Sequence, residues 1–397
     1  MSELEIGPSV TPLGHCASQA QVHDVRETLP SHRSYMPSGS AIIATSARHP
    51  WVQLLLVVVP LLLVGCDQGG GSGAKDPNAA CLNTENLKKG AERGSIEALT
   101  DPPVLDPDDV ENLRDSDRVV ALLVGSTPLA VPRKLLNQHE IVNLDDWLDK
   151  PIIVTHCPLT KSSLAFEREA VNGAEFDVSG LLLHNNLMMV DRRDNESLWP
   201  QMQRSAVCGP ASGTTLDMIP ILDVTWGYWR SLHPGTKVLP VTVNDRSSGQ
   251  RGRGHSVGSG ASVSKGAPSG LVLGLPRASL GGNAPKSSGR GGVAVPFRAL
   301  NDGGAVRSVE LSAEGPVVFW RREAQAAMTF GVSESFSVTE DGQIVDDQTG
   351  SVWTLDGRAV EGRRAGEQLP PVETAYVALW RAWSDFHPNT DVWSDGS

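Results

Sequence analysis

Three short segments in the middle of the 397-residue chain concentrate the side chains that do chemistry. Residues 139–143 read His-Glu-Ile-Val-Asn, residues 155–163 read Thr-His-Cys-Pro-Leu-Thr-Lys-Ser-Ser, and residues 184–191 read His-Asn-Asn-Leu-Met-Met-Val-Asp. Imidazole and thiolate groups are ligands for zinc and copper, and they also form nucleophile–base pairs. The segments therefore predict either a metal site or a thiol site.

The metal hypothesis places His139, Cys157 and His184 around a copper or zinc ion. The catalytic hypothesis makes Cys157 a nucleophile that is activated by His139 and oriented by Asn143, as in a thiol-dependent hydrolase or transferase. A third interpretation is a structural or interaction protein without an active site, in which Cys157 is a small buried hydrophobic residue. The spacing does not choose among them, because the residues belong to separate elements. We interpret Glu140, next to His139, as an exposed side chain.

An internal duplication indicates where a site should be. The pattern Trp-x₂-Trp-x₃-His-Pro-x-Thr occurs at residues 226–236 and again at residues 380–390. Upstream segments align as well, which gives a repeat unit of roughly 120 residues, the size of a domain. The two Trp of each copy are three residues apart and share one helix face, so we expect core anchors. A His suits the C-terminus of each helix.

The second copy lacks the reactive groups. Asn301-Asp302 stands near the His-Glu position and Trp320 near the Cys position. We therefore expect any site, for a metal ion or a small ligand, to lie on the first copy.

The local patterns predict a β-rich α+β fold of two tandem, divergent copies, each ending in a Trp-bearing helix. A hairpin is expected over residues 119–131, a short helix over 132–138 and a strand over 152–156. Asn172-Gly173 predicts a second hairpin between residues 164 and 178. Residues 187–191 and 198–202 are expected to form a further strand pair.

The first third of the chain bears on location. Residues 51–64 are apolar but too short for a membrane span of about 20 residues. They end in Leu63-Val64-Gly65-Cys66, which resembles the bacterial lipobox. We expect lipidated Cys66 to anchor an extracytoplasmic protein to the cell membrane, on its periplasmic side.

The domain boundaries that follow run along the whole chain. Residues 1–35 are expected to be a non-native or disordered extension, 36–65 a lipoprotein signal peptide and 66–95 a flexible tether. The first repeat unit spans 96–242, a Gly/Ser-rich linker 243–268 and the second, degenerate unit 269–397.

Charge and cysteine content narrow the partners. The net charge of −12 argues against nucleic acid, which requires a basic face. Cys66 is expected to be acylated and Cys16 to be absent from the mature protein. Cys81, Cys157 and Cys208 remain, and their number leaves the disulfide state open.

Taken together, these motifs resemble a bacterial family, the domain of unknown function numbered three-one-seven-nine. The resemblance rests on residues 139–143, Cys-Pro-Leu at 157–159, Val-Ser-Gly-Leu-Leu at 178–182, Ser-Leu-Trp at 197–199 and the Trp-motif ending. It covers residues 95–240 strongly and 270–397 weakly. It implies kinship and no activity. Many relatives carry a second cysteine where this chain has Thr160, so dithiol redox cycling is not expected here.

Overall fold

The computed structural model describes residues 86–124, 126–145, 150–241, 268–280, 291–312 and 315–395. The chain separates into two units, Met1–Gly70 and Gly71–Ser397, and every described residue belongs to the second. The predicted extension and signal peptide, with Cys66, lie outside the described residues, as do Cys81 and most of the linker. Below, "first half" means described residues 86–241 and "second half" means described residues 268–395.

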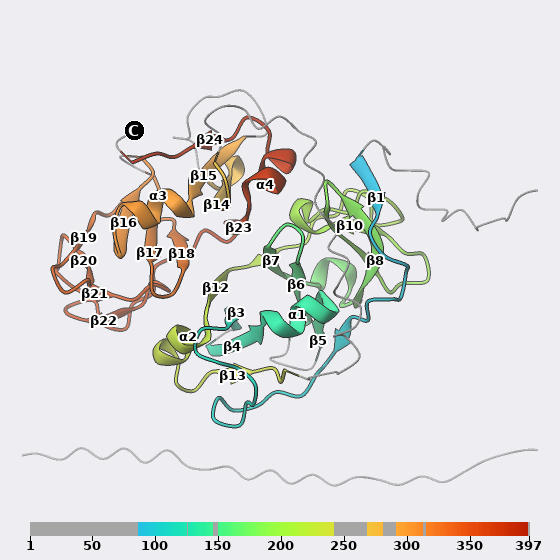
Figure 1. Ribbon diagram of the computed structural model, residues 1–397, viewed down its shortest axis with the longest axis horizontal. Coiled ribbons are helices and arrows are strands. Elements are labelled where there is room, and N and C mark those ends of the chain that lie inside the picture. Colours follow the sequence, from blue (N-terminus) through green and yellow to red (C-terminus); the bar gives the residue numbers. More distant parts are fainter. Residues whose placement is uncertain are drawn as a thin grey trace, which may run out of the picture. The chain divides into compact units, whose positions relative to one another are not determined.

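Short strands make up most of both halves, as expected for a β-rich α+β protein (Figure 1). The described residues contain four α-helices, none longer than seven residues: α1 Arg133–His139, α2 Trp226–Leu232, α3 Phe297–Asp302 and α4 Trp380–Phe386. No helix in this part of the chain is long and apolar enough to cross a membrane.

The first half opens with the predicted hairpin, strands β3 (Arg118–Val124) and β4 (Thr127–Pro132). Strand β12 (Ile221–Thr225) pairs antiparallel with β3, and β13 (Lys237–Val238) pairs parallel with β4. Successive side chains of a strand point to opposite faces. Val119 and Val120, both fully buried, enter different hydrophobic clusters, so both faces of this sheet are covered. The uninterrupted apolar run of β3 follows from that double burial.

The chain then builds the two sheets that carry the reactive segments. One sheet has β5 (Ile141–Leu144), β6 (Ile152–Cys157) and β7 (Ser162–Glu167) at its centre, with β2 (Leu99–Thr100) and β11 (Met218–Ile219) at its edges. The other sheet consists of β8 (Phe176–Leu183), β9 (Asn186–Asp191) and β10 (Leu198–Pro200), with β1 (Leu87–Lys89) at the edge beside β8. Helix α1 packs on β6 and on the first hairpin (Figure 1).

The predicted hairpin around Asn172-Gly173 is wrong. Strand β7 pairs with β6 and β11, whereas β8 pairs with β1 and β9, so the two strands lie in different sheets. A 3₁₀ turn (Glu169–Val171) precedes Asn172, which adopts the left-handed conformation with φ of 56°. Asn-Gly here turns the chain from one sheet into the next, because each flanking strand pairs with other strands. The predicted pair β9–β10 is confirmed.

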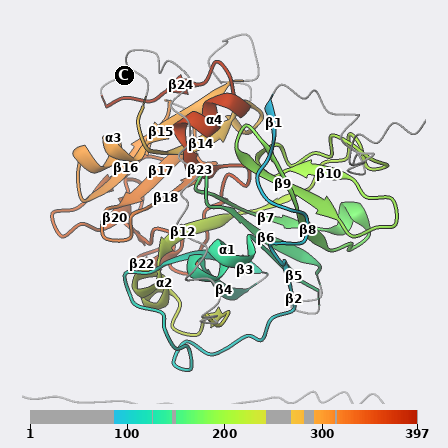
Figure 2. The same cartoon turned by 45° about the vertical axis from the view of Figure 1, so that its right-hand side comes forward.

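The second half contains three sheets (Figure 2). The first has the order β23-β14-β15-β24, from strands Tyr376–Leu379, Leu271–Pro276, Gly292–Pro296 and Asp391–Val392, and its last pair is also parallel. The second sheet contains β16 (Val306–Glu310), β17 (Val317–Arg321) and β18 (Ala326–Phe330). The third contains β19 (Phe336–Val338), β20 (Ile344–Asp346), β21 (Val352–Trp353) and β22 (Ala359–Glu361).

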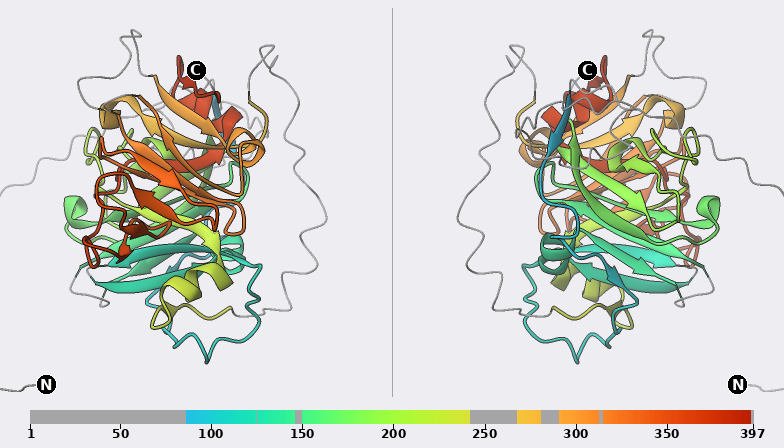
Figure 3. Two further views of the ribbon diagram at one scale, coloured as in Figure 1. Left: turned by 90° about the vertical axis from the view of Figure 1, so that its left-hand side faces the viewer. Right: turned by 90° about the vertical axis from the view of Figure 1, so that its right-hand side faces the viewer.

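Two of the hydrophobic cores cross between the halves. One joins Trp226 and Trp229 of the first half to Phe319 and Trp353 of the second. Another contains residues of strands β6, β7, β8 and β9 from the first half together with residues of β14, β23 and α4 from the second, including Trp383. Strands β12 and β18 are in contact, and Figure 3 shows the orange strands of the second half beside β12. Each half therefore completes the core of the other.

The Trp helices act as predicted. Trp229 and Trp383 are almost fully buried, and their indole N–H groups donate to Thr236 Oγ1 (2.9 Å) and Thr390 Oγ1 (3.0 Å). Helices α2 and α4 end at the C-cap residues His233 and His387. Trp380, by contrast, is only partly buried.

Candidate functional site

A pocket of about 260 Å³ opens in the first half beside β1 and β8. Its walls are mainly apolar, and Leu159, Val178 and Leu187 are among the residues that form them. Its polar groups come from Lys88, Glu140 and Asn185, with the Lys88 ammonium 3.2 Å from the Asn185 side-chain oxygen. A mostly apolar cavity with a few polar groups is the usual form of a small-molecule site.

Glu140 sits in this pocket because of how α1 ends. It is the C-cap residue, and its N–H donates to Leu136 O at 2.8 Å while its own carbonyl accepts from the N–H of His156 at 2.8 Å. Its backbone has φ 58° and ψ −31°, a sparsely populated region for a residue other than glycine. Burial raises the pKa of its carboxyl to about 7. Our interpretation of Glu140 as an exposed side chain is therefore wrong, because β1 and β8 enclose it.

Cys157 lies at the end of β6, behind the pocket wall. The residue is 2% exposed, and its Sγ lies 3.7 Å from the backbone oxygen of Asn185. Burial raises the pKa of this thiol; hydrogen bonds from Thr160 lower it in part, and the negative charge of Glu140 adds a smaller rise. The protonated thiol thus predominates at neutral pH, and a protonated thiol is a poor nucleophile.

The other predicted site residues have partners of their own. His139 Nδ1 lies 2.8 Å from the carbonyl oxygen of Glu97, so this nitrogen carries the proton and donates. Asn143 is fully buried, and its side chain binds the backbone of Leu99 and Phe176 at 2.8–3.1 Å. Among the described residues, no hydrogen bond joins His139 to Cys157.

His184 occupies the turn between β8 and β9, with φ of 50°, and its ring meets the Phe386 ring edge-on at 5.2 Å. Within the described ranges, no group of three or more His, Cys, Asp or Glu side chains is arranged to hold a metal ion. The predicted set of His139, Cys157 and His184 therefore gains no support as a copper or zinc site.

A buried polar network lies beside Cys157, and its central residue, Gln201, is not among the residues that the sequence motifs predicted. Gln201 lies at its centre: its Oε1 accepts from Ser162 Oγ (2.7 Å) and Asn186 Nδ2 (2.8 Å), and its Nε2 donates to Thr155 Oγ1 (2.9 Å). All four side chains are fully buried. The network ties β6, β7 and β9 together and so fixes the strand end that carries Cys157. The only sequence signal was a run of polar residues on strands that are otherwise apolar.

One family model, described as a protein of unknown function (DUF3179), matches residues 93–390. The chain belongs to this family. The match spans both halves, including Glu140, Cys157 and both Trp helices, and it agrees with the resemblance drawn from the motifs. No curated protein and no solved structure matches the chain.

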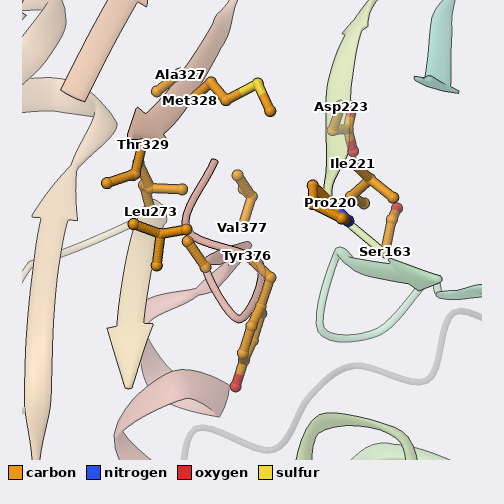
Figure 4. A pocket seen from close by; sticks show the side chains of 12 residues that line it. Ser163, Pro220, Ile221, Asp223, Leu273, Ala327, Met328, Thr329, Tyr376 and Val377 are labelled. Atoms are coloured by element: carbon orange, nitrogen blue, oxygen red, sulfur yellow. The ribbon is translucent and has the colours of Figure 1, made fainter. Parts of the chain in front are cut away.

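This DUF3179 protein has a second, much smaller cavity where its halves meet. Figure 4 shows Ser163 and Asp223 facing Thr329 and Tyr376 across it. Its volume of about 20 Å³ has room for roughly one water molecule. Thr329 Oγ1 is buried there without a hydrogen-bond partner among the described residues.

The serine in this small cavity is not arranged as a nucleophile. His156 Nε2 faces the Arg133 guanidinium at 3.3 Å and must accept from it, which leaves the proton on Nδ1. Nδ1–H then donates to Ser163 Oγ at 2.9 Å, whereas a general base would accept from the hydroxyl. Burial and then the charge of Arg133 lower the pKa of His156 to about 3. The cluster is a buried structural link that continues through Arg133 to Asp223 (3.2 Å).

Proposed function

We propose that the first half binds a small, largely apolar molecule in the 260 Å³ pocket, and that Glu140 exchanges a proton or hydrogen bond with its polar head group. The observation that carries the proposal is the half-buried Glu140 carboxyl in the pocket, whose pKa is raised to about 7. A carboxyl poised at that value serves equally as proton donor and acceptor near neutral pH. A strongly perturbed group in a pocket is a candidate functional residue.

The backbone of Glu140 supports the same proposal. A non-glycine residue held in a sparsely populated region costs on the order of 1–3 kcal/mol. In the second half, α3 ends instead at Gly303, with an ordinary φ of −80°. The first half thus keeps a strained glutamate where glycine or a relaxed backbone would serve the fold, which favours a role for its carboxyl.

The thiol hypothesis has less support than this carboxyl-centred one. Cys157 is buried and its pKa is raised, the opposite of what an activated cysteine requires. Alkylation with iodoacetamide at about pH 7.5 separates the two: we expect Cys157 to react slowly unless the protein unfolds. Rapid alkylation of Cys157 in the folded protein would favour the hydrolase or transferase.

The binding proposal is tested with three six-carbon probes that differ only in the head group: 1-hexanol, hexylamine and hexanoate. Calorimetric titration at about pH 5.5 and about pH 8.5 brackets the pKa of Glu140. We expect hexylamine to bind more tightly at the higher pH, where Glu140 is ionised. Glu140→Gln should abolish that difference in affinity between the two pH values.

Two further variants locate the binding. Leu182→Trp fills the pocket and should remove binding of 1-hexanol and hexylamine. Val360→Trp adds the same bulk at an exposed position of the second half and should leave binding unchanged. The proposal fails if no probe saturates, or if Glu140→Gln binds hexylamine with the same pH dependence as the unaltered chain.

We also propose that the two halves are divergent copies of one unit. Three kinds of observation support this: both first sheets have one strand order with a parallel last pair, both Trp helices end at a His C-cap, and corresponding indoles have corresponding partners. Trp199 Nε1 donates to Asp191 (2.9 Å), and Trp353 Nε1 donates to Asp346 (3.0 Å). An experimental structure in which residues 118–240 and 270–392 fail to superpose would contradict this proposal.

Finally, we propose that the protein is an extracytoplasmic lipoprotein anchored through Cys66. Cys208 is disulfide-bonded, whereas Cys157, the other described cysteine, is free. Disulfides persist mainly outside the cytoplasm, which supports that location. Cys66→Ser should abolish incorporation of labelled fatty acid and release the protein from the membrane fraction. Unchanged labelling and fractionation would refute the anchor.

A further inference from the structure

Helix α2 ends against a carboxylate supplied by the second half. His233 Nε2 lies 2.8 Å from Asp356 Oδ2, and Arg358 Nε lies 3.1 Å from the same oxygen. His233 and Asp356 are both buried. Burial raises the pKa of Asp356, but hydrogen bonds from His233 and Thr354 and the charge of Arg358 outweigh it and hold that pKa below its ordinary value. The helix end thus closes on an ionised carboxylate.

Helix α4 ends in the corresponding way but without a carboxylate. His387 Nε2 lies 2.7 Å from the Tyr376 hydroxyl, and no acidic side chain in the described ranges pairs with this His. Burial lowers the pKa of His387 to about 4, so its ring is neutral at pH 7. Beside the pair is a cavity of about 350 Å³, lined also by Arg204, Met202 and Phe386.

The turn that faces α4 shows why His387 has no counterpart of Asp356. In the second half, Asp356 precedes Gly357, whose φ is 81° and whose carbonyl accepts from Leu369 N–H at 2.9 Å. In the first half, Arg204 has φ of 54°, and its carbonyl accepts from Leu216 N–H at 3.0 Å, so the turn is the same. The residue before Arg204 is the exposed Gln203. An amide therefore stands where the other turn has its acid.

The cavity has the polar groups to bind an anion. The Arg204 guanidinium has no acidic partner within the described residues, and a guanidinium presents a planar fork that matches a carboxylate. Burial raises the pKa of Tyr376, and the charge of Arg204 opposes that rise, which places the guanidinium near the hydroxyl. When neutral His387 carries its proton on Nε2 and donates to the Tyr376 oxygen, the Tyr376 O–H is free to donate into the cavity.

We propose that this cavity binds a small monocarboxylate with an apolar body, in the position that Asp356 takes at the other helix. Arg204 pairs with the carboxylate and Tyr376 donates a hydrogen bond to it. Met202, Met218 and Phe386 contact the apolar body. One cation and one hydroxyl match a single negative charge, whereas a phosphate dianion would need further cationic partners.

Phenylacetate is the test ligand, and phenylacetamide is its uncharged match. Calorimetric titration of the purified chain should show saturable phenylacetate binding, with phenylacetamide about tenfold weaker or worse. Arg204→Gln should weaken phenylacetate binding about tenfold or more and leave phenylacetamide unaffected. Arg298→Gln removes an exposed arginine of α3 and serves as the control, with no change expected.

Two variants separate this site from others on the chain. Gln203→Asp supplies the missing acid and should compete with phenylacetate, lowering its affinity as Arg204→Gln does. Leu182→Trp blocks the Glu140 pocket and should leave phenylacetate binding intact. The proposal is overturned if phenylacetate does not saturate, if Arg204→Gln binds it normally, or if Leu182→Trp alone removes binding, which would assign the ligand to the Glu140 pocket.

Discussion

For Glu140, the sequence predicted the region of the site but not the orientation of the side chain. The segment His-Glu-Ile-Val-Asn drew attention to the end of α1, and Cys157 was expected nearby. The sequence could not show that the glutamate, rather than the histidine, enters the pocket. That orientation depends on the positive φ at the C-cap and on strands β1 and β8, which lie about 50 residues before and about 40 residues after Glu140.

The raised pKa of Glu140 predicts a pH dependence of stability. In the unfolded chain its pKa is near 4.5 and in the folded protein about 7, so between these values the folded state binds more protons. Stability should therefore fall as pH rises from about 4.5 to about 7 and stay at the lower level above. Glu140→Gln should remove this part of the fall, measured as the change in urea midpoint between about pH 5 and about pH 8.

The measured quantity is the difference between the variant and the unaltered chain, because other groups titrate too. His156, whose pKa is lowered to about 3, acts in the opposite sense, since stability is lost as pH falls below its unfolded value of 6.5. Parallel midpoints for the two proteins across this pH range would show that the Glu140 carboxyl is solvated.

Among the elements, the Trp helices were the most predictable. Two copies of a long motif predicted a helix that carries both Trp residues and ends at a His, and both helices do so. The Asn-Gly turn was the least predictable, because turn chemistry specifies a reversal of the chain but not which strands pair afterwards. Strand β7 pairs with β6 and β8 pairs with β9, so each strand forms its hairpin with the neighbour on its other side in the sequence.

Trp229→Ala and Trp383→Ala should each lower the free energy of unfolding by about 3–5 kcal/mol, because each empties a buried site and leaves a threonine hydroxyl without its indole partner. Trp380→Ala is the matched control on α4 and should cost less, since this side chain is partly exposed. Chemical denaturation followed by circular dichroism measures all three. Equal losses for Trp380 and Trp383 would mean that both side chains are buried to the same extent.

At the scale of the whole molecule, the crossing cores were not predictable. The duplication indicated two units but gave no sign that Trp229 packs with Phe319 and Trp353 of the other half. Apolar residues on both faces of β3 were compatible with any covering layer. Which surface covers a sheet is a property of the tertiary fold, and one sequence without its partners in space does not specify it.

The crossing cores predict that neither half is stable alone. A chain that ends at residue 241 should be poorly soluble and bind a hydrophobic dye, because Val119 and Trp226 would lose their cover. Co-expression with residues 268–397 should restore soluble protein. A protease site inserted between residues 242 and 267 of the full chain should be cleavable without separating the fragments on gel filtration. A soluble, cooperatively unfolding first half would contradict this prediction.

The placement of β3 between two cores also determines the order in which its two faces become buried during folding. Val119 belongs to a cluster with Phe319, roughly 200 residues further along, and contacts that distant in sequence form slowly. As the chain emerges, the face of β3 that carries Val120 and Leu122 packs early, because its contacts are with residues of the first half. The other face, which carries Val119, is covered only after the second half of the chain has been made. During that interval one apolar face of the sheet is uncovered, which favours aggregation of the folding intermediate.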